Sequence, residues 1–439
     1  MSPEAIGMTL LGTLIVTIFF GFPISFTLLF LAVVFGWIGF GGRVFDLMVF
    51  QTLGLMKEET LAAVPLFIFM GYIVEQAGLM ERLFKAFRDI LAPLKGSLYL
   101  GVILTATVFA MATGIVGAAV TVLGIMAAPI MIKAGYSPRL SAGAIAAGGT
   151  LGILIPPSVM LVVMGPVLGV SVAKLYAAAF GPGFLLSALY ISYLLLRSYL
   201  NPKVGPAVPL EERVGSARAI VREFLVGMVP LGGLICATLG SILGGLATPS
   251  EAAAVGASGA IVLALLYREL DWTKLKQASF STLQTSSMVL FLAVASNIFG
   301  SVFARLGSAT LITNTLIALP VPPFAMVLIV MGLISLLGWP FEWPAIILIF
   351  LPIFLPLLLA LKIDLVWFGA VTAVNIQTAF LSPPVAMSAY YLKAVVPQWD
   401  LRTIYAGMMD FMILQVIALV LVMVFPQIAV WFPNYLFGP

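Results

Sequence analysis

The sequence predicts an all-α polytopic membrane protein with two inverted repeats, each containing a re-entrant helical hairpin and a proline-broken helix. Of its 439 residues, 62% are hydrophobic and only 9% are charged, whereas a soluble domain has about 25% charged residues. The apolar stretches are continuous and about 20 residues long, as a helix needs to cross a bilayer, and do not alternate like barrel strands. Proline and glycine landmarks also recur at a nearly constant spacing, which indicates an internal repeat.

The composition excludes several classes of function. There is no histidine and one cysteine, Cys236, so a disulfide framework and a Cys/His metal site are both excluded. We therefore expect no enzymatic activity and no cofactor. The net charge of +4 gives no indication of nucleic-acid binding. No basic residue precedes the first apolar stretch, so we expect that stretch to be retained as a helix.

Ten apolar stretches have the length of a single crossing. Two further stretches, 97–132 and 321–360, are too long for one crossing and are interrupted at 112–117 and 337–344. Segments 80–95 and 268–279 carry charges at helical spacing and are expected to be interfacial amphipathic helices. The ten single stretches are 5–20, 24–40, 61–79, 141–170, 178–197, 224–246, 249–267, 280–302, 365–396 and 403–425.

Charge distribution suggests that both long stretches are re-entrant hairpins. Basic residues flank 97–132 on both sides, with Lys95 before it and Lys133 after it. Cytoplasmic loops are enriched in Lys and Arg, so both ends of this stretch are expected in the cytoplasm. If each later apolar stretch crosses the membrane once, both ends of 321–360 and both chain termini lie on the side opposite the cytoplasm.

The repeats are defined by landmarks at one offset. Pro156 and Pro383 lie 227 positions apart, as do Pro129 and Pro356. An odd number of crossings per repeat makes the two repeats inverted, which is typical of secondary transporters with a site at the membrane midplane. The expected division is a first repeat at 1–203, a cytoplasmic linker at 204–223 and a second repeat at 224–439.

The first interrupted helix, 141–170, has a glycine pair and a proline pair. Gly148 and Gly149 are expected to loosen the helix, and Pro156-Pro157 interrupts its hydrogen bonding. Carbonyl groups freed near 148–154, with the hydroxyls of Thr150 or Ser158, would suit a sodium ion. The alternative is a proline kink that packs against a neighbouring helix.

The second interrupted helix, 365–396, carries polar side chains on an apolar background. Asn375, Gln377 and Thr378 are costly in lipid and should face a cavity. Two interruptions at symmetric positions favour a binding site over two kinks. The hairpin tips would complete it: Thr113 and Gly114 in the first repeat, and Gly338 with Glu342 in the second.

Other polar residues have structural interpretations. Glu342 either faces the site or caps the helix that begins at Trp343. Asp410 is expected to be paired at a helix contact. Thr248 and Glu251 have the spacing of a capping box.

These patterns give two overlapping sets of site residues. The predicted substrate-binding residues are Gly114, Gly149, Thr150, Ser158, Gly338, Asn375, Gln377 and Thr378. The predicted sodium ligands are Thr113, Gly114, Gly148, Gly149 and Thr150 around one ion, and Gly338, Asn375, Thr378 and Ser382 around another.

Four blocks of the chain resemble the large (M) permease subunit of tripartite ATP-independent periplasmic (TRAP) transporters, within the ion transporter superfamily. The strongest is Ala147-Gly-Gly-Thr-Leu-Gly-Ile-Leu-Ile-Pro-Pro-Ser158, continuing to Pro166. The others are Ala179-Phe-Gly-Pro-Gly-Phe-Leu185, Thr248-Pro-Ser-Glu-Ala-Ala-Ala254 and the block from Asn375 to Val385. This ordered set spans nearly the whole chain.

The resemblance implies a sodium-driven, elevator-type transporter in a bacterial inner membrane. It would take up a small organic acid delivered by a periplasmic binding protein, the P subunit. It also implies a small four-helix Q subunit, expected as a separate chain, with Na⁺ as the coupling ion. The alternative is a sodium-coupled carboxylate transporter that works without a binding protein. An intramembrane enzyme and a passive channel are disfavoured because the polar residues cluster at two symmetric points.

The chain departs from the family pattern at two places. Ile115 and Val116 stand at the first hairpin tip, where Ser-Ser is common in the family. Val385-Ala386 follows the second proline pair, where glycine is usual at the second position. Any sodium ligand at the first tip would then be Thr113 or a backbone carbonyl.

Overall fold

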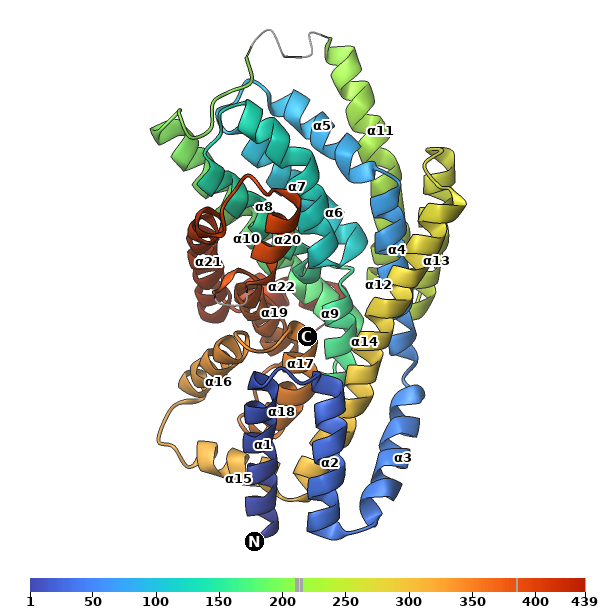
Figure 1. The fold of residues 1–439 in the computed structure, drawn as a ribbon, viewed down its shortest axis with the longest axis vertical. Helices are drawn as coiled ribbons and strands as arrows, with labels where there is room; N and C mark the ends of the chain where they lie inside the picture. The colour runs from blue at the N-terminus through green and yellow to red at the C-terminus, as the bar shows by residue number, and fades with distance from the viewer. Residues whose placement is uncertain (210–212, 214–215, 384–385, 439) are drawn as a thin grey trace.

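The chain is helical throughout the part that the structure describes. The structure is a computed structural model that describes residues 1–209, 213, 216–383 and 386–438. Within these residues there is no strand. Eight helices are long and apolar enough to cross a membrane, or up to nine if a bent helix pair counts as one span. The predicted all-α polytopic architecture is confirmed (Figure 1).

The N-terminal helices pack against one long helix. Helices are found at the predicted stretches 5–20, 24–40 and 61–79, whereas α3 is an additional amphipathic helix. Helices α2, α3 and α4 all contact α14. The bounds are α1 Pro3–Phe19, α2 Ile24–Phe40, α3 Arg43–Met56, the 3₁₀ turn η1 Glu59–Ala62, α4 Ala63–Gln76 and α14 Trp272–Arg305.

Of the two predicted amphipathic helices, one is found as a separate helix and the other is not. Helix α5 (Leu79–Leu91) is amphipathic, with Leu83 and Phe84 buried. Residues 272–279 instead form the first turns of α14, so the prediction of a separate helix at 268–279 was wrong. The Asp271 carboxylate accepts a hydrogen bond from the Lys274 amide (2.7 Å) and starts α14. No proline follows within the helix to end it.

Both long stretches are helix pairs interrupted where the sequence predicted. The first pair is joined at Gly114-Ile115, and the second at 338–342. In Figure 1 the first pair lies in the upper half of the molecule and the second in the lower half. The bounds are α6 Ser97–Thr113 and α7 Val116–Lys133, then α16 Pro323–Leu337, α17 Trp343–Ala345, the π-helical turn η4 Ile346–Phe350 and α18 Leu351–Ala360.

Both broken helices are also present. Helices α8 (Pro138–Leu154) and α9 (Val159–Leu168) are bent by 43° at their break. Helices α19 (Leu365–Leu381) and α20 (Met387–Val395) flank the second break, which includes Pro384 and Val385, outside the described residues. Helices α8 and α19 start 227 positions apart (138 and 365) and end 227 apart (154 and 381), so the repeat spacing extends to helix boundaries.

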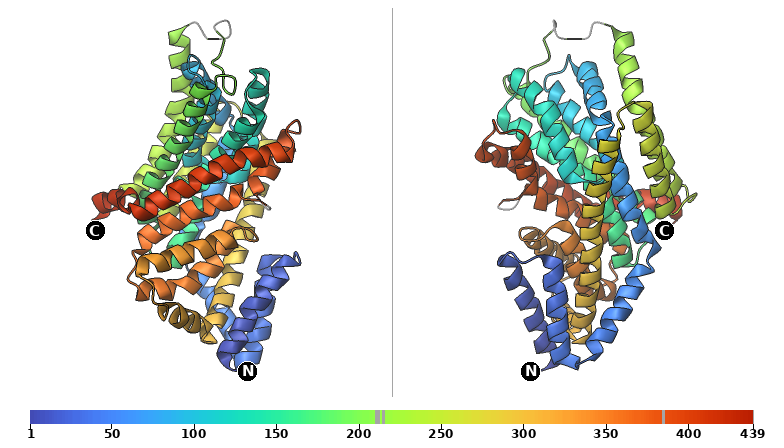
Figure 2. Two further views of the ribbon diagram at one scale, coloured as in Figure 1. Left: turned by 90° about the vertical axis from the view of Figure 1, so that its left-hand side faces the viewer. Right: turned by 45° about the vertical axis from the view of Figure 1, so that its right-hand side comes forward.

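The remaining helices complete the body of the molecule. The predicted capping box is confirmed, since the Glu251 amide donates to Thr248 Oγ1 (3.3 Å) and the Thr248 amide donates to Glu251 Oε2 (2.8 Å). Figure 2 shows α21 and α22 running obliquely across the molecule, away from the N-terminal helices. The bounds are α10 Val172–Leu200, α11 Ala217–Ile235, η3 Cys236–Gly240, α12 Ser241–Leu243, α13 Pro249–Leu266, α15 Ser308–Ile317, α21 Leu401–Val424 and α22 Gln427–Phe437.

Candidate functional site

A cavity of about 490 Å³ lies where both hairpin tips and both helix breaks meet α4 and α14. Residues 114–118 of the first tip and Glu342-Trp343 of the second line it. Ile153 and Val159 line it from either side of the first break, and Phe380 and Met387 from either side of the second. The site is therefore built from both repeats.

The first hairpin tip is a tight turn that contacts the first helix break. Gly114 has φ +64°, a left-handed conformation that favours glycine. A Cβ there would lie 3.3 Å from the Pro157 carbonyl oxygen, so the tip contacts the first helix break. The Thr113 hydroxyl donates to the Phe109 carbonyl (3.2 Å). Ile115 and Val116 present apolar side chains in the cavity wall.

The glycine pair of the first broken helix has a packing role. Helix α8 continues through Gly148 and Gly149 to Leu154, so the expected loosening at 148–149 was wrong. A Cβ at Gly149 would lie 2.3 Å from a Val120 methyl group, and one at Gly148 would lie 3.1 Å from Ala106 Cβ. Their missing side chains thus let α7 and α6 approach α8 closely.

The two hydroxyl groups near the first break form hydrogen bonds with protein groups and do not face the cavity. Thr150 is fully buried, donates to the Ala147 carbonyl (2.8 Å) and accepts from Gln415 Nε2 of α21 (3.4 Å). The Ser158 hydroxyl donates to the Ile153 carbonyl. Neither residue lines the cavity. Among the predicted residues of the first repeat, Gly114 is the one that does.

The polar residues of the second broken helix lie mainly behind the cavity wall. Asn375 is fully buried, where its Nδ2 donates to the Met331 carbonyl (2.8 Å) and its Oδ1 accepts from the Ser335 hydroxyl (2.7 Å). The Thr378 hydroxyl donates to the Asn375 carbonyl (2.7 Å). These bonds connect α19 to α16 and engage both the nitrogen and the oxygen of the Asn375 amide in helix packing.

Three further predicted residues of the second repeat lie close to this wall. Gln377 is fully buried, and its amide has no hydrogen-bond partner among the described residues. Gly338 has φ −63°, an ordinary helical conformation that any residue can adopt. A Cβ at Gly338 would lie 2.9 Å from Ala379 Cβ, so the tip and α19 are in close contact. Ser382 is buried at the C-terminus of α19.

Glu342 occupies the helix-start position but does not cap it. It is the N-terminal flanking residue of α17, and its side chain accepts no capping hydrogen bond. Its carboxylate lines the cavity instead. Of the two interpretations, the structure favours the one in which Glu342 faces the site.

Helices α4 and α14 supply cavity residues that the sequence patterns missed. Tyr72, Glu75 and Gln76 come from α4. Gln277, Ser281 and Thr285 come from α14 at a spacing of four, which places them on one face. The Tyr72 and Thr285 hydroxyls lie 3.2 Å apart. The polar positions on one face of α14 were the signal that could have found this wall.

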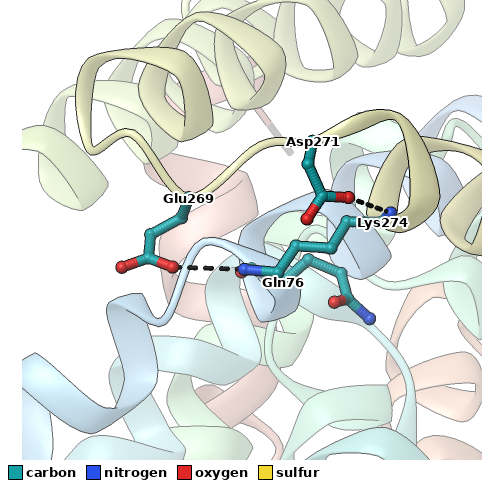
Figure 3. A network of polar contacts seen from close by, with 4 residues as sticks. All are labelled: Gln76, Glu269, Asp271 and Lys274. Atoms are coloured by element: carbon teal, nitrogen blue, oxygen red, sulfur yellow. Dashed lines mark hydrogen bonds and ion pairs between the residues drawn. The ribbon is translucent and has the colours of Figure 1, made fainter.

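A second, more polar space of about 570 Å³ adjoins the cavity and shares Glu75 and Gln76 with it. We call it the vestibule. Besides Glu75, its charged lining comes from α5, α11, the turn before α14 and the first turn of α14. Lys274 of α14 donates to Glu269 Oε2 in the preceding turn (3.1 Å) and to the Gln76 carbonyl (3.5 Å), which joins the start of α14 to the end of α4 (Figure 3). The other charged lining residues are Glu81, Arg82, Lys85 and Glu223.

Asp410 is paired at a helix contact, as predicted. Its Oδ1 accepts from Arg139 Nη2 at 2.6 Å, and its Oδ2 accepts from the Tyr193 hydroxyl at 3.0 Å. These bonds connect α21 with α8 and α10. Asp410 does not line the cavity.

Comparison with known proteins gives consistent matches. The family model described as "Tripartite ATP-independent periplasmic transporter, DctM component" matches residues 11–428. The "C4-dicarboxylate TRAP transporter large permease protein DctM" of Pseudomonas aeruginosa is 30% identical over 383 residues, covering 87% of each chain. The "Sialic acid TRAP transporter large permease protein SiaM" of Vibrio cholerae is 28% identical, covering 96% of this chain and 97% of that one.

A fused relative and two solved structures extend the comparison. The "Isethionate TRAP transporter permease protein DctMQ" of Oleidesulfovibrio alaskensis is 30% identical over 336 residues, covering 76% of this chain and 52% of that one. The YdaH transporter of Alcanivorax borkumensis has a TM-score of 0.66 at 17% identity, covering 99% of this chain and 100% of that one. Neisseria gonorrhoeae MtrF has a TM-score of 0.58 at 14% identity, with coverages of 90% and 84%. These structures share the fold.

Proposed function

Because this chain belongs to the DctM component family of tripartite ATP-independent periplasmic transporters, we propose that it is the large membrane subunit of a sodium-coupled importer for a small organic acid. Members of this family are transport permeases and not enzymes, and the chain is a multi-pass membrane protein of this kind. Secondary transport of an organic acid follows from the family. The sodium coupling, the inner-membrane location and the elevator mechanism are parts of the proposal.

The observation that carries the proposal is the cavity shared by both repeats. Secondary transporters place their site where two interrupted helices meet near the midplane. Here both breaks and both tips line one space, whose other walls are α4 and α14. In an elevator mechanism, the hairpins and broken helices would carry the substrate past α4 and α14.

Sodium binding is proposed at the two places where a tip meets a break. A helix that ends at a break leaves carbonyl oxygens without helical partners, and these are ligands that Na⁺ accepts. Gly114 touches the first break, and Gly338 touches the end of α19 next to Ser382. Thr113, Gly114 and Ser382 lie at or beside these contacts. The Thr150 and Asn375 side-chain oxygens are less suited as ligands, because they already accept hydrogen bonds from Gln415 and Ser335.

The proposed partners are the other TRAP components. A periplasmic binding protein would deliver the acid, and a small four-helix subunit would join this chain in the membrane. One relative is named DctMQ, in agreement with a close association of large and small subunits. The second candidate, a carboxylate transporter that works without a binding protein, predicts full uptake by the membrane subunits alone.

The deciding experiment is uptake into proteoliposomes that contain the membrane subunits, with and without the binding protein. We expect uptake to require external Na⁺ and to increase when valinomycin makes the lumen negative. A monoanion carried with two Na⁺ brings in one net charge, which adds roughly 2.3 kcal/mol of driving force at about 100 mV. Full uptake without Na⁺, driven by a proton gradient, would contradict the proposal.

Ser382→Ala and Thr150→Ala form a matched pair for the sodium sites. Each removes one hydroxyl oxygen and leaves the prolines of the break in place. We expect the apparent sodium affinity to decrease more in Ser382→Ala, because the Thr150 hydroxyl is directed towards Gln415. An unchanged sodium affinity in Ser382→Ala would place the second ion elsewhere.

A further inference from the structure

Two acidic side chains line the cavity without a cation beside them in the described lining. Glu75 of α4 and Glu342 of the second tip both line it, and none of its described lining residues is Lys or Arg. Within the described part of the chain, neither glutamate takes part in an ion pair. The nearby cations line only the vestibule, where Lys274 is already paired with Glu269 (3.1 Å). A simple carboxylate entering the cavity would therefore meet two carboxyl groups and, among the described lining residues, no cation with which to pair.

The first hairpin provides a site of opposite polarity in the same cavity. Helix α7 is 18 residues long and begins at Val116, and its flanking residue Ile115 offers no capping side chain. Val116, Gly117 and Ala118 all line the cavity. The first amide groups of a helix have no helical partner and carry a partial positive charge, so this end favours a carboxylate.

Aromatic side chains lie beside the glutamates. Tyr72, Trp343 and Tyr391 line the cavity, and Tyr391 lies close enough to Glu342 and Tyr72 to interact with both electrostatically. A Cβ at Gly117 would lie 3.1 Å from the Tyr391 ring, so this ring also touches the start of α7. Aromatic rings next to carboxylates form a favourable environment for an organic cation.

Resting on the proposed function, we propose that the transported acid also carries a positively charged nitrogen. Its carboxylate is held at the N-terminus of α7, and its cationic nitrogen lies among Glu75, Glu342 and the aromatic rings. A zwitterion of this kind offers a carboxylate to the helix N-terminus and a cation to the acidic side chains, whereas a dicarboxylate leaves both glutamates without a cationic partner. A volume of about 490 Å³ accommodates a molecule of this class.

The test compares acids that differ only in the charged nitrogen. Cells that express the complete three-component system receive an equimolar mixture of aspartate and succinate, glutamate and glutarate, alanine and propionate, and the N-acetylated amino acids. Depletion of each compound is followed by mass spectrometry with and without Na⁺. We expect the ammonium-bearing member of at least one pair to be taken up at least roughly tenfold faster than its nitrogen-free and N-acetylated counterparts.

Charge-neutral variants then assign the preference to the cavity. Glu342→Gln and Glu75→Gln should each reduce this preference about tenfold while the protein remains in the membrane in normal amount. Glu59→Gln, an exposed glutamate outside the cavity lining, is the matched control and should keep the preference.

The other outcomes separate this inference from the function on which it rests. Sodium-dependent uptake of the nitrogen-free or acetylated acids in preference to the zwitterions overturns the inference and keeps the proposed function. An altered sodium dependence in both glutamine variants, with the two classes of acid taken up equally, assigns the glutamates to a coupling ion and also overturns it. No sodium-dependent depletion of any acid overturns the proposed function and the inference together.

Discussion

The two repeats make the same helix contact with different chemistry. In the first repeat, α8 meets α6 at Gly148, where the missing side chain lets Ala106 approach. In the second repeat, the residue 227 positions later is Asn375, which connects α19 to α16 through hydrogen bonds with Met331 and Ser335. Small residues and interhelical hydrogen bonds are the two common ways to hold membrane helices together.

This difference shows that a polar residue in an apolar helix is not by itself a ligand. Asn375 is one of the polar residues that the sequence suggested as ligands, yet its amide is used in packing. The acidic side chains of the cavity are Glu75 and Glu342, which lie outside both broken helices. In this chain, the broken helices shape the site, and residues of the second tip and of α4 supply its acidic groups.

The largest effect is expected from a side chain at Gly149. In Gly149→Val, the new Cβ would lie 2.3 Å from a Val120 methyl group and 3.0 Å from the Val120 backbone nitrogen. Because backbone atoms cannot move aside cheaply, we expect a destabilisation of about 3 kcal/mol or more and little folded protein. Size-exclusion profiles and the thermal unfolding midpoint in detergent provide the measurement.

The equivalent position in the second repeat is the control for that substitution. Ile376 is buried, and Ile376→Val should cost only about 0.5–1.5 kcal/mol. If Gly149→Val folds as well as Ile376→Val, the close contact of α7 with α8 is not needed for folding. The proposed difference between the two repeats would then be wrong at this position.

An intermediate effect is expected at the hydrogen-bonded contact. Asn375→Ala removes both bonds to α16 and should lower stability by about 1–2 kcal/mol, with a parallel loss of transport. Ser335→Ala removes only the bond to Asn375 Oδ1, because the Asn375 Nδ2 bond to the Met331 carbonyl (2.8 Å) does not involve Ser335. A double-mutant cycle between the two measures their coupling, and strictly additive effects would argue against the bond.

The smallest effect is expected at the glycine-mediated contact. In Gly148→Ala, the new methyl group would lie 3.1 Å from Ala106 Cβ, a distance that a shift of a few tenths of an ångström relieves. The change from glycine to alanine in a helix gains up to about 1 kcal/mol, so the net change should stay within about 1 kcal/mol. A loss of stability as large as that of Asn375→Ala would show that the contact of α8 with α6 tolerates an added methyl group no better than the α19 contact tolerates loss of its hydrogen bonds.

The sequence predicted the breaks well because their causes are local. Proline removes a backbone donor and limits the preceding residue, so Pro156-Pro157 interrupts a helix in any surroundings. Gly114 likewise marks the first tip, where the backbone has a positive φ. The 227-residue spacing was visible for the same reason, since it is carried by prolines and glycines.

The sequence predicted the site less well because the partner of a polar group is not a local property. Thr150 and Ser158 looked like ligands, yet Thr150 bonds to Gln415, which is 265 positions away. Tyr72, Glu75 and Thr285 were not identified because their orientation depends on how α4 and α14 pack.

By itself, the sequence determined that the chain is a helical membrane protein, where its helices are interrupted and that the interruptions recur. These features follow from backbone hydrogen bonding in lipid and from the conformations of proline and glycine, which act within a few residues. Only the tertiary structure decided which polar groups are used up in packing and which remain open to the cavity. Asn375 is bonded to a carbonyl 44 positions earlier, whereas Glu342 faces the cavity without a capping bond, because distant helices decide which groups find partners.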